Sequence, residues 1–275
     1  METRVEIKIV VENSIYKEKL LAEHGLSFWI KMGNKEYLFD TGQGLVLDNN
    51  LEELGININD LTGILLSHGH YDHANGLKGL FEARSDLKLY GHSDIFIPKY
   101  SQRSSGLLYR GMNITRDDVE NFIPVNKARE IEKGLWMTGE IAVDNREEIL
   151  RPDYKVKVND ELKIDQFNDD QALFIETKKG IVVLLGCSHS GVVNTLKHIK
   201  KLTGGQRIAA IIGGMHLIHA DLERIDAIID YLQELDFDFL APLHCTGFKA
   251  AARMNSVFKD KVVAGGVGEM FSFQL

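Results

Sequence analysis

The sequence lacks the long apolar segments of a membrane protein, and it contains few cysteines and prolines. Its longest apolar runs, Ile181–Leu185 and Ile208–Ile212, are far shorter than the ~18 residues of a membrane span. Two cysteines in 275 residues cannot form a disulfide framework, and we expect them to be thiols in a reducing compartment. Only four prolines and no Gly- or Ser-rich linker leave no composition-based domain boundary. We therefore expect a single domain over residues 1–275 and no membrane partner.

The sequence also lacks a signal peptide and an excess of positive charge. The N-terminal residues have no uninterrupted apolar core or small-residue cleavage site, which predicts a cytoplasmic protein. The 32 Lys and Arg residues are outnumbered by 40 Asp and Glu residues, so the formal net charge is −8. Because binding to a phosphate backbone normally needs a basic surface, we expect no nucleic-acid partner. A small anionic metabolite remains compatible with this composition.

Apolar and alternating runs predict about eleven strands, with helices between the later ones. The predicted strands are Val5–Val11, Ser27–Met32, Glu36–Phe39, Gly63–Ser67, Leu87–Tyr90, Leu135–Thr138, Ala172–Thr177, Ile181–Gly186, Ile208–Ile212, Phe239–Pro242 and Lys261–Ala264. Helical patterns at residues 191–202, 222–235 and 248–258 follow the caps Ser190, Asp221 and Thr246. Two sheets packed face to face with helices outside would accommodate this α/β order.

Ten histidines are present, and three of them fall in the string His68-Gly69-His70-Tyr71-Asp72-His73. The string follows an apolar strand, and α/β proteins place their chemistry at such strand ends. A polar surface loop is the alternative, but four potential ligands in six residues favour a metal site. Imidazole with carboxylate suits zinc, iron or manganese. Two such ions would form a hydrolytic site.

This string is similar to the His-x-His-x-Asp-His motif of the metallo-β-lactamase superfamily. Phe39-Asp40-Thr41-Gly42 resembles the early strand-end motif of that family, and Pro242-Leu243-His244 resembles its late strand ending in a histidine ligand. The resemblance implies a four-layer αββα sandwich, the metallo-β-lactamase fold. It also implies two divalent metal ions, with zinc favoured and iron or manganese as alternatives. His68 and His70 would hold one ion, and Asp72, His73 and His244 the other.

Further strings resemble one branch of the superfamily, the dihydropterin-methyl-ribofuranosylaminobenzene-phosphate synthase-like proteins. These strings are His24-Gly25-Leu26-Ser27, Gly186-Cys187-Ser188-His189-Ser190-Gly191, Gly213-Gly214-Met215-His216-Leu217 and Leu243-His244-Cys245-Thr246-Gly247. The resemblance implies an enzyme that joins a dihydropterin pyrophosphate to an aminobenzoate-ribose phosphate. A substrate does not follow from a fold, so the enzyme's chemistry has to be argued from its site.

The chain departs from the superfamily pattern at two places. A Gly-His-Thr string and a bridging Asp after a later strand are usual, but here residues 168–171 read Asn-Asp-Asp-Gln and Cys187 takes the bridging position. We infer that His189 completes the first site, with Cys187 or Asp170 as further candidate ligands. A thiolate ligand would favour zinc or iron over magnesium. A small buried structural thiol is the alternative for Cys187.

Three further side chains and one ligand are candidates for roles around the metals. His216 follows a strand and the pair Gly213-Gly214, and we interpret it as a substrate-side general acid or hydrogen-bond donor. Asp72 is a catalytic candidate as well as a ligand. Asp40 ends a strand and could orient a metal-binding histidine, with a turn-forming Asp as the alternative. His24 is a candidate substrate-binding residue, although Gly25 could equally mark a hairpin turn.

Positive charge gathers in residues 97–116, which contain Lys99, Arg103, Arg110 and Arg116 and no acidic residue. We expect an insert at about 93–130 near the active site, where Arg103 and Arg110 would bind phosphate and neighbouring tyrosines would contact a planar ring. Ser190 at a helix N-terminus would add an anion-binding end. A solvated loop is the alternative for this segment.

These observations predict a metal-dependent hydrolase or transferase. Its substrate would be a phosphorylated or pyrophosphorylated, ring-containing metabolite, and a pterin-related synthase is the specific form that the resemblance suggests. An iron-dependent redox protein on the same scaffold and a non-catalytic metal-binding protein are the alternatives. Cys245 is expected to pack beneath the site, and His92, His198 and His219 to have structural or surface roles.

Overall fold

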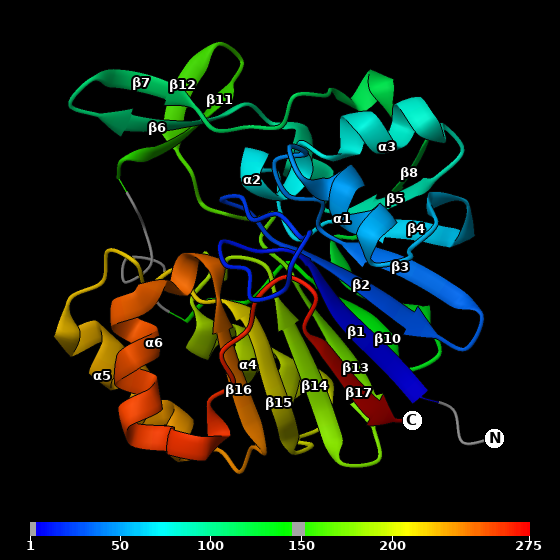
Figure 1. Ribbon diagram of the computed structural model, residues 1–275. Coiled ribbons are helices and arrows are strands. Elements are labelled where there is room, and N and C mark those ends of the chain that lie inside the picture. The colour runs from blue at the N-terminus through cyan, green and yellow to red at the C-terminus, as the bar shows by residue number, and fades with distance from the viewer. Residues whose placement is uncertain (1–3, 145–151) are drawn as a thin grey trace.

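The computed structural model describes residues 4–144 and 152–275, and within them two large sheets pack face to face (Figure 1). The first sheet has the strand order β17 (Met270–Gln274), β1 (Arg4–Val11), β2 (Ser27–Met32), β3 (Lys35–Phe39), β4 (Leu61–Leu65), β5 (Lys88–Gly91) and β8 (Asn121–Pro124). The second has the order β16 (Phe239–Leu243), β15 (Ile208–Gly214), β14 (Gly180–Leu185), β13 (Ala172–Thr177), β10 (Leu135–Gly139) and β9 (Lys127–Glu132).

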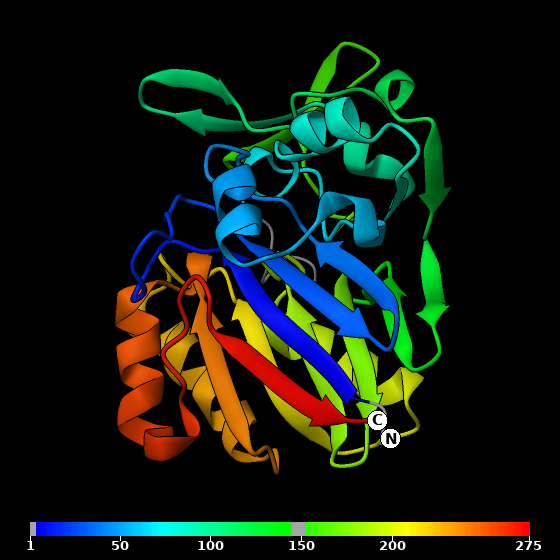
Figure 2. The same cartoon turned by 45° about the vertical axis from the view of Figure 1, so that its right-hand side comes forward.

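Helices cover the outer face of each sheet. The α-helices are α1 (Leu47–Glu53), α2 (Tyr71–Ala74), α3 (Leu77–Ala83), α4 (Val192–Leu202), α5 (Leu222–Gln233) and α6 (Gly247–Phe258). Short 3₁₀ helices are η1 (Ile58–Asp60), η2 (Ser93–Phe96), η3 (Arg116–Asp118), η4 (His244–Thr246) and η5 (Lys259–Lys261). In Figure 2, α1 to α3 lie beside the first sheet and α4 to α6 beside the second. The expected four-layer αββα sandwich is therefore confirmed.

Three apolar cores lie between these four layers. Phe28 of β2 and Leu184 of β14 belong to the core between the two sheets. Leu80 of α3 belongs to the core on the outer side of the first sheet, and Ile229 of α5 to the core on the outer side of the second. Alternating burial in β1 and helical spacing in α5 put these side chains inside, because strands repeat every two residues and helices every 3.6.

The three predicted helices begin within one residue of where the sequence places them, but not every predicted capping residue caps its helix. Asp221 caps α5 as expected, since its side chain accepts the N–H of Arg224 at 2.9 Å. Helix α4 is capped by Gly191 with a φ of 88° instead of Ser190. The N–H of Ser190 instead donates to Asp170 Oδ2 at 2.8 Å. That amide therefore has a carboxylate partner, and the anion-binding end at Ser190 stays a prediction.

A third, smaller sheet lies above the two large ones in Figure 1, and we name it the cap sheet. Its strand order is β12 (Glu161–Ile164), β11 (Tyr154–Val158), β6 (Lys99–Arg103) and β7 (Gly106–Tyr109). The segment 93–130, where the sequence predicts an insert, thus supplies β6 and β7 to the cap sheet. It also supplies β8 to the first large sheet and the start of β9 to the second. Strands β11 and β12 come from a segment for which the sequence predicts no strand.

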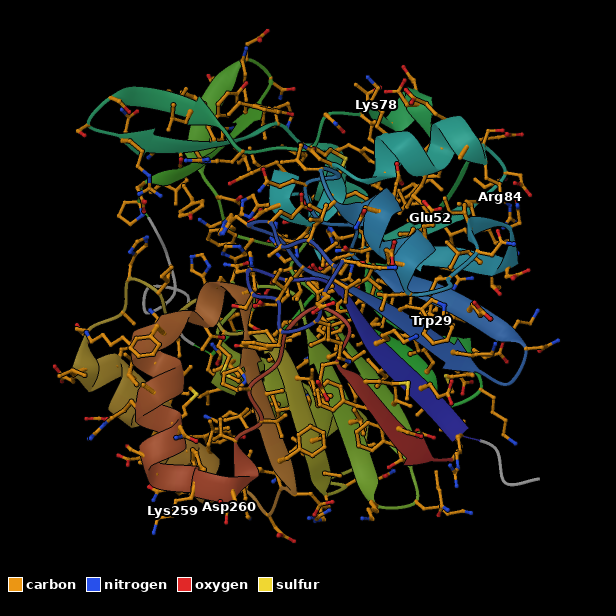
Figure 3. The ribbon with its side chains drawn as sticks, in the orientation of Figure 1. Trp29, Glu52, Lys78, Arg84, Lys259 and Asp260 are labelled. Atoms are coloured by element: carbon orange, nitrogen blue, oxygen red, sulfur yellow. The ribbon has the colours of Figure 1, made fainter. Side chains whose placement is uncertain are left out.

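The predicted strand Lys261–Ala264 is wrong. Residues 259–261 form η5, and Val262 makes an isolated bridge to Leu240. Figure 3 shows Lys259 and Asp260 at the lower end of α6, where the chain turns. The last strand is β17 instead, which pairs with β1 at the edge of the first sheet. Within residues 4–144 and 152–275, no helix is both long and apolar enough to cross a membrane.

Candidate metal centre

The candidate ligands meet where parallel strands of both large sheets end. The string 68–73 follows β4, which is parallel to β3 and β5 in the first sheet. Cys187 and His189 follow β14, His216 follows β15 and His244 follows β16, and these three strands are parallel neighbours in the second sheet. The carboxyl ends of parallel strands share one edge of a sheet, which is where α/β proteins bind ligands.

Gly69 allows the string to turn between its first two histidines. A Cβ atom at this position would lie 2.0 Å from the backbone oxygen of Ile95, so no larger residue fits. The N–H of Gly69 donates to Asp169 Oδ2 at 2.9 Å. The contacts with Ile95 and with Asp169 therefore fix the position of this turn.

His68, His70 and His189 form the first cluster. His70 Nδ1 lies 3.1 Å from His189 Nε2, close to the separation of about 3.3 Å for two nitrogens on one tetrahedral zinc with Zn–N bonds of 2.0–2.1 Å. Ligand atoms of His68, Cys187 and His189 all lie within 4.8 Å of one another. The imidazoles of His68, His70 and His189 are all buried, so this cluster resembles a metal site more than a solvated group.

Burial keeps the first cluster uncharged. Burial, and after it the charge of Lys99, lowers the pKa of His70 to about 3. Burial also lowers the pKa of His68 and His189 well below the usual range. Neutral imidazoles carry the lone pair that a metal ion needs.

Asp72, His73 and His244 are the second cluster that the sequence predicts, and the structure divides them between two ligand groups: His73 and His244 with Cys187, and Asp72 and His244 with His24. Asp72 Oδ2 lies 3.4 Å from His244 Nε2, and it also lies 3.1 Å from the half-exposed ring of His24. The other ring nitrogen of His244, Nδ1, is 2.9 Å from Asn13 Oδ1. This contact orients the His244 ring with Nε2 toward Asp72, as an outer hydrogen bond orients a ligand in known metal sites.

Asp40 supports the second cluster from behind. Its Oδ2 accepts from His73 Nδ1 and from Ser67 Oγ, both at 2.7 Å, and its Oδ1 accepts the N–H of Ser67 at 2.7 Å. Burial alone would lower the pKa of His73, but the charge and hydrogen bond of Asp40 raise it to about 9. The geometry therefore puts a carboxylate beneath a candidate ligand, the position that the sequence suggests for Asp40.

Cys187 lies between the two clusters. Its Sγ is 3.1 Å from His73 Nε2, and it shares one ligand group with His68 and His189 and another with His73 and His244. Burial raises the pKa of the Cys187 thiol, so a neighbouring cation is needed to stabilise the thiolate. A thiolate here would be placed to bridge two ions.

Asp170 is less well placed as a ligand. One of its oxygens accepts the Ser190 N–H, and burial raises the pKa of its carboxyl to about 7. Its other oxygen is buried and lacks a hydrogen-bond partner among the described residues. None of the ligand groups found among the described residues includes Asp170, and none includes His70, although the His70 ring lies 3.1 Å from that of His189.

The donor set fits a zinc-class ion. His68 Nε2 and His244 Nε2 are two of the buried ring nitrogens that have no hydrogen-bond partner among the described residues. Such atoms are costly unless another group satisfies them. Nitrogen, carboxylate and thiolate ligands with three side chains per cluster are those of zinc sites that keep an open position.

A cavity of about 160 Å³ opens beside these clusters. Predicted site residues that line it are His24, His70, Asp72, Arg103, Arg110, Cys187, His189 and His216. Arg103 pairs with Asp153 at 2.9 Å and lies over the Tyr154 ring, 5.8 Å from its centroid. The cap sheet thus covers the edge of the large sheets where the candidate metal ligands lie.

Sequence reasoning missed several residues that complete the site. Tyr154 and His219 line the cavity, and Phe167 stacks on His189 with ring centroids 4.5 Å apart. Phe167 directly precedes the string Asn-Asp-Asp-Gln that departs from the family pattern, which is a signal that could have drawn attention to it. Tyr154 lies in an unremarkable polar segment, so the sequence offers no such signal.

Two sheets with helices outside, and clustered imidazoles at their shared edge, define a metal-dependent enzyme of the αββα class. The chain belongs to the metallo-β-lactamase superfamily, because residues 21–198 match the family described as "Metallo-beta-lactamase superfamily". This membership supports a hydrolase-like enzyme that binds divalent metal.

Similar proteins extend over nearly the whole chain. An "Uncharacterized protein MJ0448" of Methanocaldococcus jannaschii is 35% identical over 96% of this chain and 98% of its own. The 7,8-dihydropterin-6-methyl-4-(beta-D-ribofuranosyl)-aminobenzene-5'-phosphate synthase of the same organism is 31% identical over 94% of this chain and 92% of its own. The solved structure of Tm1679, described as a metal-dependent hydrolase of the beta-lactamase superfamily, has a TM-score of 0.85 and 29% identity. It covers 98% of this chain and 99% of its own.

Proposed function

We propose that this protein is a metal-dependent hydrolase or transferase acting on a phosphorylated or pyrophosphorylated, ring-containing metabolite. The observation that supports it is the pairing of two arginines with two tyrosines on the cap side of the metal cavity. Arg110 lies over Tyr71, 5.6 Å from the ring centroid, and Arg103 lies over Tyr154. Guanidinium groups recognise phosphate, and aromatic faces recognise planar rings.

Two clusters would hold the metal ions in this proposal. His68, His70 and His189 form one, and Asp72, His73 and His244 the other, with Cys187 between them. Bound divalent ions would supply Lewis-acid polarisation of a phosphate oxygen and a nucleophile at neutral pH. Zinc suits the mixed nitrogen and sulfur set, and iron or manganese are the alternatives.

Arg110 is the stronger phosphate-binding candidate of the two arginines. A guanidinium has five N–H donors. Arg110 donates from Nε to Ser101 Oγ at 2.9 Å, a neutral partner that does not offset its charge. Arg103 donates Nη1 to the carboxylate of Asp153 at 2.9 Å, which offsets its charge. Arg103 is then placed to orient Tyr154 and to contact a second part of the substrate.

A second cavity of about 340 Å³ lies next to the first. Both are lined by Arg103, Tyr154, His216 and His219. An elongated substrate could put its phosphate near the metals and its ring system along Tyr154. His216 lies at the junction, where its ring could donate a hydrogen bond or a proton to a departing group. Asp72 Oδ2 lies 3.1 Å from His24 Nε2. His24 therefore lies at the mouth of the cavity, beside a charged candidate ligand.

A pterin-related synthase is the specific form of this proposal. The relative that is 31% identical carries in its printed name both a dihydropterin ring and a 5'-phosphate. Two neighbouring cavities would suit a transferase, because a transferase has to hold two substrates together. A hydrolase would need only the metal-side cavity.

The proposal is tested on protein purified anaerobically without added metal. Its metal content is measured first, and we expect zinc bound to the native protein. Phosphoesters, pyrophosphates, lactones and thioesters are then assayed with native protein and with the Arg103→Ala and Arg110→Ala variants. Loss of a charged hydrogen bond of about 1.5–3 kcal/mol should lower kcat/KM for anionic substrates roughly 10- to 100-fold in Arg110→Ala.

Arg253→Ala is the matched control, because Arg253 is an exposed residue of α6 that pairs with Asp226. Its kcat/KM should equal that of native protein. Preferred turnover of neutral lactones or thioesters, with full activity in both cavity variants, would contradict the anionic-substrate proposal. Iron as the sole metal, with redox turnover and no hydrolysis or transfer, would favour the redox alternative.

A further inference from the structure

Three neighbouring parallel strands each end in a soft metal donor. Cys187 follows β14, His216 follows β15 and Cys245 follows β16. Their ligand atoms all lie within 4.8 Å of one another. The chain has only two cysteines, and the fold brings both to one cavity although they are far apart in sequence.

The backbone around Cys245 is built to hold its sulfur in place. A Cβ atom on Gly214 would lie 2.7 Å from Cys245 Sγ, so glycine at this position leaves room for the sulfur. The N–H groups of Leu217 and Ile218 both donate to the Cys245 carbonyl, at 3.0 and 3.1 Å. These two hydrogen bonds hold the loop after β15 against the turn after β16.

His216 contributes to this arrangement twice. Its backbone N–H donates to Cys245 Sγ at 3.2 Å, and its φ of 49° puts it in the left-handed region that non-glycine residues rarely adopt. Its ring Nδ1 is buried and has no hydrogen-bond partner among the described residues. Burial of an unpartnered nitrogen costs free energy, and the ring of His216 also interacts with the Cys245 side chain.

We propose that Cys187, Cys245 and His216 form a further metal position for zinc or another thiophilic divalent ion. Two thiolates and one imidazole are a known catalytic zinc set, which leaves the fourth position open to the cavity. The His216 N–H would stabilise the Cys245 thiolate as outer hydrogen bonds do in metal sites. Binding a divalent ion would release the two thiol protons to solvent, since the thiolate is the ligand form.

This position can be tested separately from the two clusters of the proposed function. Cys187 belongs to several ligand groups in the described part of the chain, but Cys245 and His216 belong only to this one. Substitution of Cys245 or His216 therefore removes the new position and keeps every histidine of the two clusters. The measurement uses no substrate, so its outcome does not depend on the reaction proposed above.

The test is the thiolate-to-cobalt charge-transfer absorption of the cobalt-substituted protein. We expect Cys245→Ser to lose about half of this absorption, because the Cys245 thiolate is removed while Cys187 can still bind cobalt together with the histidines of the two clusters; serine keeps the side-chain volume. Thr246→Ser is the matched control, since it alters the same turn and keeps the hydroxyl that accepts the Met215 N–H. Its absorption should equal that of native protein.

His216→Ala gives a second measurement that keeps both cysteines. Loss of one ligand should weaken cobalt binding at the thiolate-rich position by at least about tenfold, measured by titrating the same absorption band. This variant decides the question if Cys245→Ser does not fold. An unchanged band in folded Cys245→Ser, or an unchanged cobalt affinity in His216→Ala, would overturn the proposal.

Discussion

Asp40 shows how one residue links the end of a strand to a candidate metal ligand. It follows β3, and its φ of 62° is in the left-handed region, where aspartate is found more often than most residues. That conformation lets its carboxylate accept from His73 and twice from Ser67. The string 68–73 is thus fixed at both ends by a single buried carboxylate.

Asp40→Asn should weaken the second cluster. The amide keeps the size of the side chain but replaces one acceptor oxygen by a donor, so it cannot satisfy all three donors. We expect zinc affinity to fall roughly 10- to 100-fold and the free energy of unfolding to fall by about 1–3 kcal/mol. Zinc competition with a chelator and urea denaturation measure these two quantities. Asp60→Asn, at an exposed position, is the control, and native affinity in Asp40→Asn would disprove a supporting role.

At the level of the element, Lys99 connects the cap sheet to the first cluster. Its Nζ lies 3.0 Å from Asp165 Oδ2 and 2.9 Å from Asp169 Oδ1, and all three residues are buried. The other oxygen of Asp169 accepts the Gly69 N–H between two candidate ligands. The buried cation Lys99 of β6 is therefore linked, through Asp169, to the backbone of the string 68–73.

Lys99→Met should destabilise the protein and loosen the first cluster together. Methionine fills a similar volume but leaves two buried carboxylates without a cation, which costs about 3–5 kcal/mol of unfolding free energy. We also expect weaker metal binding, because Asp169 loses the partner that holds it against Gly69. Urea denaturation and zinc titration measure both effects. Lys157→Met is the control, since its exposed pair with Asp160 should contribute nothing measurable, and native stability in Lys99→Met would refute the link.

At the level of the whole molecule, the buried imidazoles determine how metal-free stability depends on pH. His68, His70 and His189 have lowered pKa values, so they stay neutral where unfolded histidines bind protons. Unfolding then takes up protons below about pH 6.5, and stability falls with acid. Asp170 acts in the opposite direction because burial raises its pKa to about 7. His73 also acts in the opposite direction, because its pKa of about 9 keeps it protonated in the folded protein at pH 7, where an unfolded histidine has largely lost its proton. Three imidazoles are therefore opposed by one carboxyl and one imidazole.

We therefore expect the chelator-treated protein to be less stable at about pH 5.5 than at about pH 7, by roughly 1 kcal/mol. We further propose that residues 1–275 unfold as one domain, so urea denaturation should show a single transition at both pH values. Zinc-loaded protein should show a steeper loss, since protons compete with the metal for imidazole. Greater stability in acid would mean that these imidazoles are charged in the folded protein.

The sequence by itself determined most strands of the two large sheets and the three helices beside the second sheet, because these depend on local periodicity, whereas the shorter helices α1 to α3 beside the first sheet were not predicted. The alternation in β1 and the helical spacing and Asp221 cap of α5 are readable within one segment. It also determined the candidate ligand string, since residues 68–73 lie together in the chain. Sequence positions are enough wherever the interacting residues are neighbours.

Only the tertiary structure decided the cap sheet and the contacts between distant segments. Strands β6 and β11 pair although about fifty residues separate them. The cap strands β7 and β12 are only four residues long and largely exposed, so neither the length nor the burial of these segments identifies them as a sheet. The meeting of Cys187 with Cys245, and of Lys99 with Asp169, is likewise absent from any local pattern. Such contacts depend on strand order and on turns such as that at His216, which bring together residues that the chain itself keeps apart.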